Sequence, residues 1–231
     1  MYRYETHLHT APISACARVD LEEALRFYKD LGHDGVFVTE HFLDGNTKID
    51  RTLPWEEQIN QYFSSYELGL ELSEKIGIKV FSGVETGRAG SHFLVYGLDK
   101  QWFIEHPEIM QMKQSENLKF LADNGGFIVH AHPFREDHFI DHIRLFPRHV
   151  HAVEIVNANR NELENSMAKI YAQSYGLFQV AGTDNHSASA QKRLGGVQSE
   201  TPLNSVEDFI EGVRNGTVTP FTMENSLLNK E

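Results

Sequence analysis

Short apolar runs that predict strands alternate along this chain with amphipathic stretches that predict helices. The predicted strands cover residues 35–39, 78–84, 93–96, 127–129, 150–156 and 177–181, and the predicted helices cover 20–32, 56–75, 108–123 and 161–175. Strands separated by helices are typical of a mainly parallel sheet. The chain has 231 residues, a length at which α/β barrels form undivided domains, and no repeat or linker-like tract interrupts it. The sequence therefore predicts one α/β domain over residues 1–231.

The amino-acid composition excludes several classes of binding partner and indicates a cellular compartment. Asp and Glu number 33 against 21 Lys and Arg, which gives a formal charge of -12 and opposes binding to long nucleic acid or to an anionic membrane. Cys16 is the only cysteine, so an internal disulfide is excluded and a reducing compartment is favoured. No apolar run is long enough to span a bilayer, and no basic-then-apolar leader is present. We expect a cytoplasmic protein with no membrane partner; its oligomeric state stays open.

Potential metal ligands follow almost every predicted strand. In chain order they are His7 and His9, Glu40 and His41, Glu85, His130 and His132, Glu154 and Asn157, and Asp184 and His186. The first pair and the last pair each have i, i+2 spacing, which places both side chains on one face of an extended chain. Because parallel α/β folds form their sites at the carboxyl ends of strands, these side chains should meet in one cleft. A single histidine at a strand end is more often a hydrogen-bonded core residue, but its recurrence in one structural position indicates a metal centre.

Five motifs occur in a fixed order along the chain: His7-Leu8-His9, Thr39-Glu40-His41, Gly83-Val84-Glu85, His132-Pro133-Phe134-Arg135 and Gly182-Thr183-Asp184-Asn185-His186. This set resembles the polymerase and histidinol phosphatase (PHP) domain family over nearly the whole chain. The resemblance implies a distorted TIM-like barrel of about seven mainly parallel strands. It also implies a site for two or three divalent ions and phosphoesterase activity.

The resemblance also implies a set of ligands. One ion would be held by His7, His9, Glu85 and Asp184, a second would share Glu85 and add His132, and a further ion would use His41 and His186. Imidazole and carboxylate ligands suit Zn²⁺, Mn²⁺ or Fe, and we rank zinc and manganese ahead of iron.

The chain departs from the family pattern at two places. Many members have an acidic residue or a histidine shortly after the first His-x-His, where residues 12–16 of this chain are Pro-Ile-Ser-Ala-Cys. Cys16 is a candidate replacement, although a single cysteine more often fills apolar space. Glu40 stands where the family usually has Asp, and we expect it to orient a ligand rather than to bind metal.

Two further histidines are ambiguous. His92 is a loose candidate for an additional ligand of the shared ion, and we leave it outside the core set. His130 shares a strand face with His132 if that strand continues, so we assign His132 as the ligand and His130 as inner support.

The expected reaction follows from the implied ions. A water that bridges two of them loses a proton near neutral pH, and the resulting hydroxide can attack phosphorus in line. Glu85 and Asp184 would take part as ligands of these ions, and Arg135 would bind the phosphoryl group through its guanidinium. Arg160 and Asn157 are further candidates for substrate contacts. The sequence contains no nucleophile elbow, dinucleotide-binding fingerprint or P-loop.

We therefore expect a metal-dependent phosphatase acting on a small phosphomonoester. A metal-dependent amidohydrolase that cleaves carbon–nitrogen bonds is one alternative, because similar His/Asp barrels hydrolyse amides and cyclic imides. A metal-binding regulatory domain without catalysis is another, and the missing ligand after His9 is compatible with it. The sequence does not distinguish one phosphomonoester from another.

Overall fold

The computed structural model describes residues 1–228, which form a mixed α/β fold with two five-stranded sheets. The first sheet has the order β10 (Val218–Glu224), β9 (Arg193–Ser199), β1 (Tyr2–Leu8), β2 (Gly35–Val38) and β3 (Lys79–Ser82). The second has the order β4 (Val84–Arg88), β5 (Ser91–Tyr96), β6 (Phe127–Ala131), β7 (Ala152–Asn157) and β8 (Phe178–Gly182). The sheets thus belong to the expected α/β class.

The expected single barrel of about seven mainly parallel strands is not what residues 1–228 form. Parallel pairing is confined to β1–β2–β3 and to β6–β7–β8, whereas β5 is antiparallel to both neighbours and β9 is antiparallel to β1 and β10. Two features cause the difference. Gly83 divides the predicted strand 78–84 into β3 and β4, and the tight turn at Ala89–Gly90 reverses the chain into β5.

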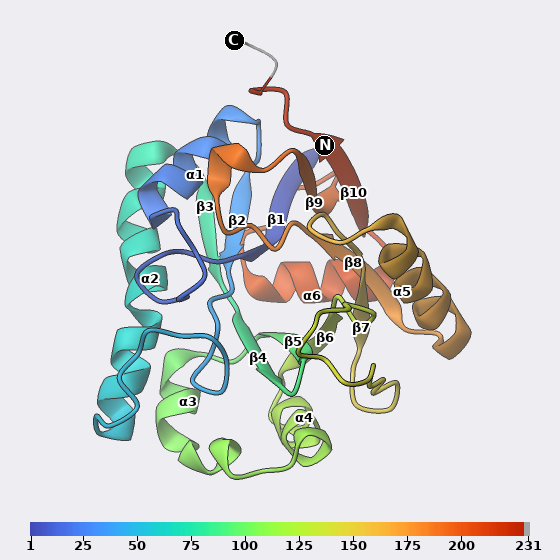
Figure 1. Cartoon of the computed structure of the whole chain (residues 1–231). Helices are drawn as coiled ribbons and strands as arrows, with labels where there is room; N and C mark the ends of the chain where they lie inside the picture. Colours follow the sequence, from blue (N-terminus) through green and yellow to red (C-terminus); the bar gives the residue numbers. More distant parts are fainter. Residues whose placement is uncertain (229–231) are drawn as a thin grey trace.

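Helices cover the outside of the two sheets. Figure 1 shows α2 (Trp55–Ile76) along one side of the molecule and α5 (Glu162–Tyr175) along the opposite side, with α3 (Lys100–Glu105) and α4 (Gln114–Asp123) at the lower end. As predicted, α1 (Leu21–Asp30) begins at Asp20, whose carboxylate accepts a hydrogen bond from Glu23 N at 2.8 Å. Within the described residues, no helix is long and apolar enough to cross a membrane.

The helix expected over residues 108–123 is interrupted. Its first part is a 3-10 turn, Pro107–Met110, and α4 begins only at Gln114. The guanidinium of Arg88 donates hydrogen bonds to the carbonyls of Ile109, Met110 and Met112 at 2.8–3.3 Å. These carbonyls would otherwise accept bonds from later turns of a continuous helix, so the arginine stabilises the break.

A cluster of aromatic side chains fills the space between the sheets. Tyr4, Phe37, Tyr96 and Phe127 come from strands of both sheets and pack with Phe209 from α6 (Val206–Asn215), and all five are fully buried. Figure 1 shows α6 lying across the strands at this level. Burying these rings stabilises the fold and leaves the carboxyl ends of the parallel strands free for polar side chains.

His33 is a buried histidine in the apolar packing, away from the carboxyl ends of the strands. It is 2% exposed, packs against Tyr28 and Phe221, and neither ring nitrogen has a hydrogen-bond partner among the described residues. Burial, and to a lesser extent Arg3, lowers the pKa of His33 to about 4. Since the unfolded chain binds a proton near the ordinary pKa of about 6.5, this histidine should destabilise the fold as the pH falls from there toward 4, on the order of 3 kcal/mol in all.

His33→Leu should remove that share of the pH dependence. Urea unfolding of both proteins near pH 7 and near pH 4 measures it: the wild type should lose more unfolding free energy than the variant over this interval. Equal losses in the two proteins would show that His33 is protonated in the folded state.

Candidate metal centre

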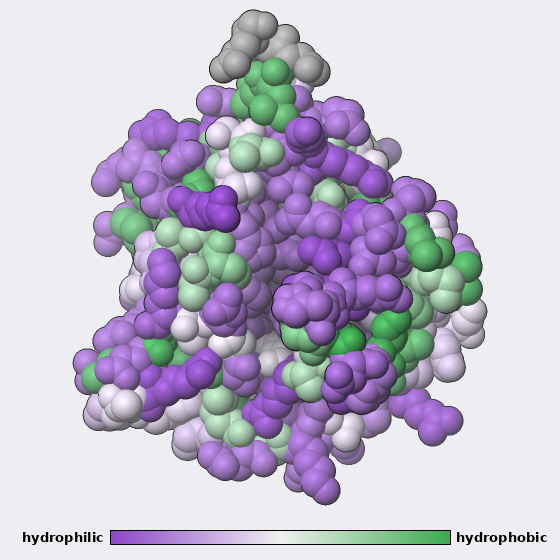
Figure 2. Space-filling view, viewed as in Figure 1, coloured by the Kyte–Doolittle hydropathy of each residue, from purple (hydrophilic) through white to green (hydrophobic). Residues whose placement is uncertain are grey.

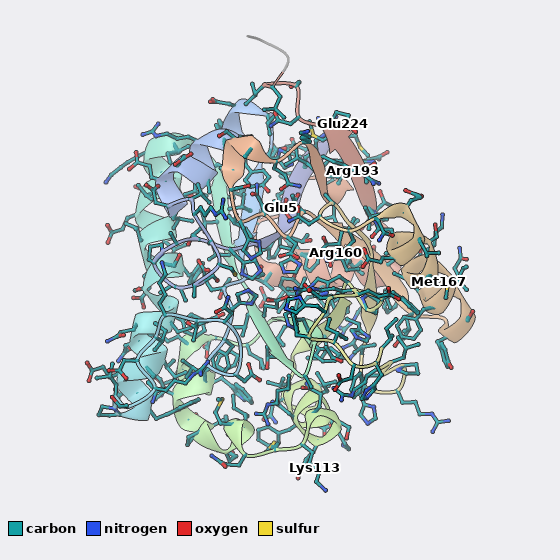
Figure 3. All side chains as sticks on the ribbon, in the orientation of Figure 1. Glu5, Lys113, Arg160, Met167, Arg193 and Glu224 are labelled. Atoms are coloured by element: carbon teal, nitrogen blue, oxygen red, sulfur yellow. The ribbon has the colours of Figure 1, made fainter. Side chains whose placement is uncertain are left out.

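Segments far apart in the sequence meet at the carboxyl ends of β1 and β8. Beyond these strands, His9 N donates to Asn185 O at 3.0 Å and Asn185 N donates to His7 O at 3.1 Å. A similar bridge joins His41 to Glu85, beyond β2 and within β4. These bridges bring the motifs together from both sheets, and Figure 3 shows nitrogen- and oxygen-bearing side chains converging at the centre of the molecule.

In their neutral forms, His7 and His9 direct their unprotonated ring nitrogens toward each other. His7 Nδ1 lies 2.9 Å from Glu154 Oε1, and His9 Nδ1 lies 3.1 Å from Ser14 Oγ. Ser14 Oγ gives its own proton to Glu40 Oε2 at 2.5 Å, so it can only accept from His9. Both Nδ1 atoms are therefore donors, and the two Nε2 atoms, 3.0 Å apart, face each other with lone pairs.

Two carboxylates converge on the same point. Glu85 Oε1 lies 3.2 Å from His7 Nε2, and Asp184 Oδ1 lies 3.5 Å from His7 Nε2 and 3.4 Å from His9 Nε2. Acceptors that face acceptors repel one another unless a cation or a proton lies among them. Burial opposes protonation of His7, but Asp184 and Glu154 raise its pKa well above the ordinary value, so a proton can occupy this position in the metal-free protein and a metal ion can replace it. The donor set therefore fits a divalent ion with imidazole and carboxylate ligands, and Glu154 and Ser14 fix the two imidazoles in the tautomer that such an ion requires.

Both carboxylates are ionised. Burial would raise the pKa of Asp184, but His7, His9 and His186 together lower it well below its ordinary value. Burial likewise opposes ionisation of Glu85, yet the surrounding histidines, His92 foremost, hold its pKa well below the ordinary value. The centre thus supplies two negative charges within an almost dry site.

Glu85 also faces His132 and His92. His132 Nε2 lies 3.5 Å from Glu85 Oε1, and His92 Nδ1 lies 3.0 Å from the same oxygen. Donor atoms of His7, Glu85 and His132 lie within 4.8 Å of one another, as do those of His41, Glu85 and His92. Glu85 therefore occupies the position from which one carboxylate can bridge two ions. His92, which was left outside the core set, lies among the ligands because the β4–β5 hairpin folds it back over Glu85.

His130 and His132 do not share a face. β6 ends at Ala131, and His132 has a φ of +29°, which turns its ring toward Glu85. His130 instead stacks on Phe93 with ring centroids 4.7 Å apart, and burial lowers its pKa to about 3. The strand does not continue to His132, so the condition for a common face is not met: the structure places His132 with the candidate ligands and His130 in the apolar packing behind them.

A third group of donors lies beside the first. One ring nitrogen from each of His9, His41 and His186 lies within 4.8 Å of the others. His186 Nδ1 lies 2.8 Å from Asp184 O, and His41 Nε2 lies 3.1 Å from Cys16 Sγ. The structure therefore brings together every residue that the sequence assigned to metal: His7, His9, His41, Glu85, His132, Asp184 and His186.

Glu154, one of the potential ligands at the strand ends, supports the candidate ligands instead of joining them. It is fully buried and accepts hydrogen bonds from His7 Nδ1, His132 N and Asn157 Nδ2, each at 2.9 Å. The signal in the sequence was a carboxylate inside the apolar run 152–156. Asn157, expected to contact the substrate, is fully buried and lies beside Asp184, with Nδ2 3.4 Å from Oδ2. Its geometry is that of a side chain that orients Asp184.

Glu40 has the orienting geometry expected of it. It is 2% exposed and accepts hydrogen bonds from Thr10, Ser14 and Ser65. These contacts hold the loop that follows His9 and position the hydroxyl that receives the His9 proton.

A pocket of about 350 Å³, a size suited to a small molecule, opens onto five of the seven candidate ligands, whereas His7 and His9 are fully buried beneath it. Its walls are formed by Cys16, His41, Asn46, Glu85, His92, His132, Arg135, Phe139, Asn159, Arg160, Asp184 and His186. Figure 2 shows a mainly hydrophilic hollow at the centre of this face, and Figure 3 places Arg160 near the centre of the same view.

Both expected arginines lie at this pocket. Both side chains line the pocket, and the buried Nε atoms of Arg135 and Arg160 have no hydrogen-bond partner in residues 1–228. Arg135 also pairs with Asp137 at 3.1 Å and lies over the ring of Phe139. Phe139 and Asn159, which the sequence did not single out, complete the wall.

No protein-family model matches the chain, and no curated protein matches its sequence. Solved structures do share its fold. A two-domain protein from Bacteroides vulgatus that contains a predicted PHP-like metal-dependent phosphoesterase superposes with a TM-score of 0.69 and 18% identity, over 95% of this chain and 64% of that one. The present chain thus spans less than two thirds of that protein.

Two further structures have similar folds. One is a proposed metal-dependent phosphoesterase from Bifidobacterium adolescentis, with a TM-score of 0.57 and 12% identity over 94% of this chain and 96% of that one. The other is an amidohydrolase from Chromobacterium violaceum with bound sulfate and no metal, with a TM-score of 0.56 and 12% identity over 96% and 98%. At these identities the similarity establishes a PHP-like fold.

Proposed function

We propose that residues 1–231 form a metal-dependent phosphoesterase domain that hydrolyses a small phosphomonoester. The observation that carries the proposal is the pair of imidazole lone pairs at His7 and His9, which face each other and two ionised carboxylates on the floor of a pocket walled by two arginines. Two fold neighbours described as phosphoesterases support the same reaction class.

The donor groups suggest how the ions would be shared. We assign His7, His9, Glu85 and Asp184 to one ion, Glu85, His132 and His92 to a second, and His41 and His186 to a third. Zinc and manganese suit these imidazole and carboxylate donors, and iron remains a third choice. When bound, such ions activate a water for in-line attack and polarise the phosphoryl oxygens.

The arginines would hold the phosphoryl group. The chain carries a formal charge of -12, so an anionic substrate needs local cations to bind at all. Arg135 and Arg160 provide two guanidinium groups at the pocket wall, each able to bind two phosphoryl oxygens. The pocket volume favours a small phosphorylated molecule over a long nucleic acid, and a cytoplasmic site of action is consistent with the single cysteine.

A carbon–nitrogen hydrolase is the second candidate, because one fold neighbour is described as an amidohydrolase. Among the described residues no lysine lines the pocket, and the group placed to bridge two ions is a carboxylate, Glu85. Two arginines suit the charge of a phosphate better than a neutral amide. Assays of the purified protein against phosphomonoesters and against amides and cyclic imides separate the two candidates.

Metal content tests the proposed function directly. Protein purified without chelator should contain at least two divalent ions per chain, because four overlapping groups of three donors lie together. Removing the ions should lower the melting temperature, and adding zinc or manganese should restore it, since metal binds only the folded form. Elemental analysis and thermal unfolding measure both effects. Less than one equivalent of any transition metal, with no gain in stability on adding metal, would contradict the proposed function.

A further inference from the structure

We propose that Cys16 is a thiolate ligand of the ion held by His41 and His186. This inference rests on the proposed metal centre, but it concerns one residue whose side chain is not needed for the other two ions. The alternative is that the cysteine fills apolar space. Cys16 is exposed and lines the pocket, which is the opposite of the burial expected of an apolar filler.

The loop that carries Cys16 is held at several points. It follows β1, and its backbone donates from Ala15 N to Asn46 O at 2.8 Å and from Arg18 N to His186 O at 2.8 Å. The second of these bonds ties the loop to His186 itself. The loop therefore presents the sulfur to the His41 and His186 rings as a consequence of the backbone geometry.

The protons on the two imidazoles leave nitrogens free to bind metal. His186 Nδ1 lies 2.8 Å from the carbonyl oxygen of Asp184, which can only accept, so Nδ1 carries the proton and Nε2 has a lone pair. His41 Nδ1 lies 2.5 Å from Glu85 Oε2, and the opposite nitrogen, Nε2, lies 3.1 Å from Cys16 Sγ. The Nδ1 side of each ring is thus bonded to an oxygen of the site, and the Nε2 atom of His41 is directed toward the sulfur.

A second observation indicates a cation at this place independently of the cysteine. One nitrogen of the fully buried His9 lies within 4.8 Å of nitrogens of His41 and His186, which forms a three-histidine cluster. His41 is held in this cluster by Glu85, whose buried Oε2 lies 2.5 Å from His41 Nδ1. Three imidazoles with ring nitrogens this close together form a donor set that suits a transition-metal ion.

A thiolate among imidazoles has consequences for metal choice. Sulfur is a softer ligand than a carboxylate oxygen, so this position should prefer zinc to manganese, whereas the positions around Glu85 use nitrogen and oxygen alone. Alkylation of Cys16 would therefore remove one ion and leave the others bound. The chain would contain two chemically distinct kinds of ion.

Cobalt substitution tests the assignment by spectroscopy. Metal-free protein loaded with Co²⁺ should show the near-ultraviolet sulfur-to-metal charge-transfer band of a cobalt thiolate. Because Cys16 is the only cysteine, any such band belongs to it. In Cys16→Ser the band should disappear and the bound metal should fall by about one ion, while the visible bands of the remaining cobalt persist. Ala15→Ser, at the exposed neighbouring position, should leave the spectrum unchanged.

Alkylation provides a second measurement on the wild-type protein. Zinc should slow the reaction of Cys16 with iodoacetamide by about tenfold or more, because a coordinated thiolate is a poorer nucleophile. Full metal content in Cys16→Ser, together with no charge-transfer band and no protection in the wild type, would overturn this proposal and leave the proposed function standing. A protein that binds no metal at all would overturn both.

Discussion

Asp184→Asn is expected to lower phosphatase activity by several orders of magnitude while the fold survives. Asp184 Oδ1 lies within 3.5 Å of both His7 Nε2 and His9 Nε2, so its negative charge faces the proposed first ion directly. The amide keeps the volume of the carboxylate but removes one of two negative charges that compensate the ions. Metal content should therefore fall by about one ion per chain. Turnover of a phosphomonoester and elemental analysis measure the two effects.

The backbone supports this substitution. Asp184 has a φ of +60°, a conformation that asparagine adopts as readily as aspartate, so the change adds no strain. In the metal-free protein the amide loses the attraction between the Asp184 carboxylate and the surrounding histidines, which holds the pKa of Asp184 well below its ordinary value. We therefore expect metal-free Asp184→Asn to melt at a lower temperature than the metal-free wild type, and the gap to widen when metal is added, because only the wild type gains the full stabilisation from bound metal. The extra difference with metal separates loss of a ligand from general destabilisation.

Thr183→Ser is the matched control. The side chain of Thr183 points away from the ions, and its hydroxyl donates to Glu5, a contact that serine retains. Metal content and turnover should stay close to those of the wild type. Full metal content and near-normal turnover in Asp184→Asn would show that Asp184 is not a ligand, and that the ends of β1 and β8 meet without sharing an ion.

The side chains of the candidate metal centre could be predicted from the sequence because each lies next to a strand end. The alternation of an extended chain places His7 and His9 on one face, and the rule that sites form at the carboxyl ends of strands brings Asp184 and His186 to the same place. The structure places Asp184 Oδ1 within 3.5 Å of both His7 Nε2 and His9 Nε2. Local geometry was sufficient wherever the ligand belonged to a parallel strand.

The positions of some side chains in the site could not be predicted from the sequence, because a single dihedral angle or a single hairpin determines where they point. His130 and His132 have the spacing of a shared face, but the positive φ of His132 ends the alternation. His92 reaches Glu85 only because a two-residue turn pairs β4 with β5. Asn157 lies at the end of its strand as expected, but its side chain is fully buried and lies beside Asp184, where it cannot reach a substrate in the pocket. None of these three outcomes is encoded in the periodicity of the sequence.

Some elements of the fold could be predicted from the sequence and others could not. Helices α1, α2 and α5 have strong amphipathic patterns and clear ends, and they form nearly where expected. β9 and β10 were missed because β9 contains Gly195–Gly196 and β10 contains Pro220, residues that weaken a strand pattern. They are stabilised by pairing along seven residues with each other and by the contact of β9 with β1, which are tertiary effects.

Arg135→Ala is expected to lower catalytic efficiency toward a phosphomonoester by about a hundredfold, on the order of 3 kcal/mol of transition-state stabilisation. The Arg135 guanidinium lies at the pocket wall with Nε unpaired, and it is held there by Asp137 and by the ring of Phe139. It does not contact the proposed ligands, so metal content should stay unchanged. Arg135→Lys should recover only part of the loss, because it keeps the charge without the two-pronged geometry.

Arg148→Ala controls for the loss of a positive charge from the same segment. Arg148 is exposed and does not line the pocket, so its removal changes the net charge of the protein equally without removing a phosphate contact. Its effect on efficiency should be small and should vanish at higher salt, whereas that of Arg135→Ala should persist because a pocket contact is less screened. Wild-type kinetics in Arg135→Ala would confine Arg135 to its ion pair with Asp137, and Arg160 would then be the phosphate contact of this pocket.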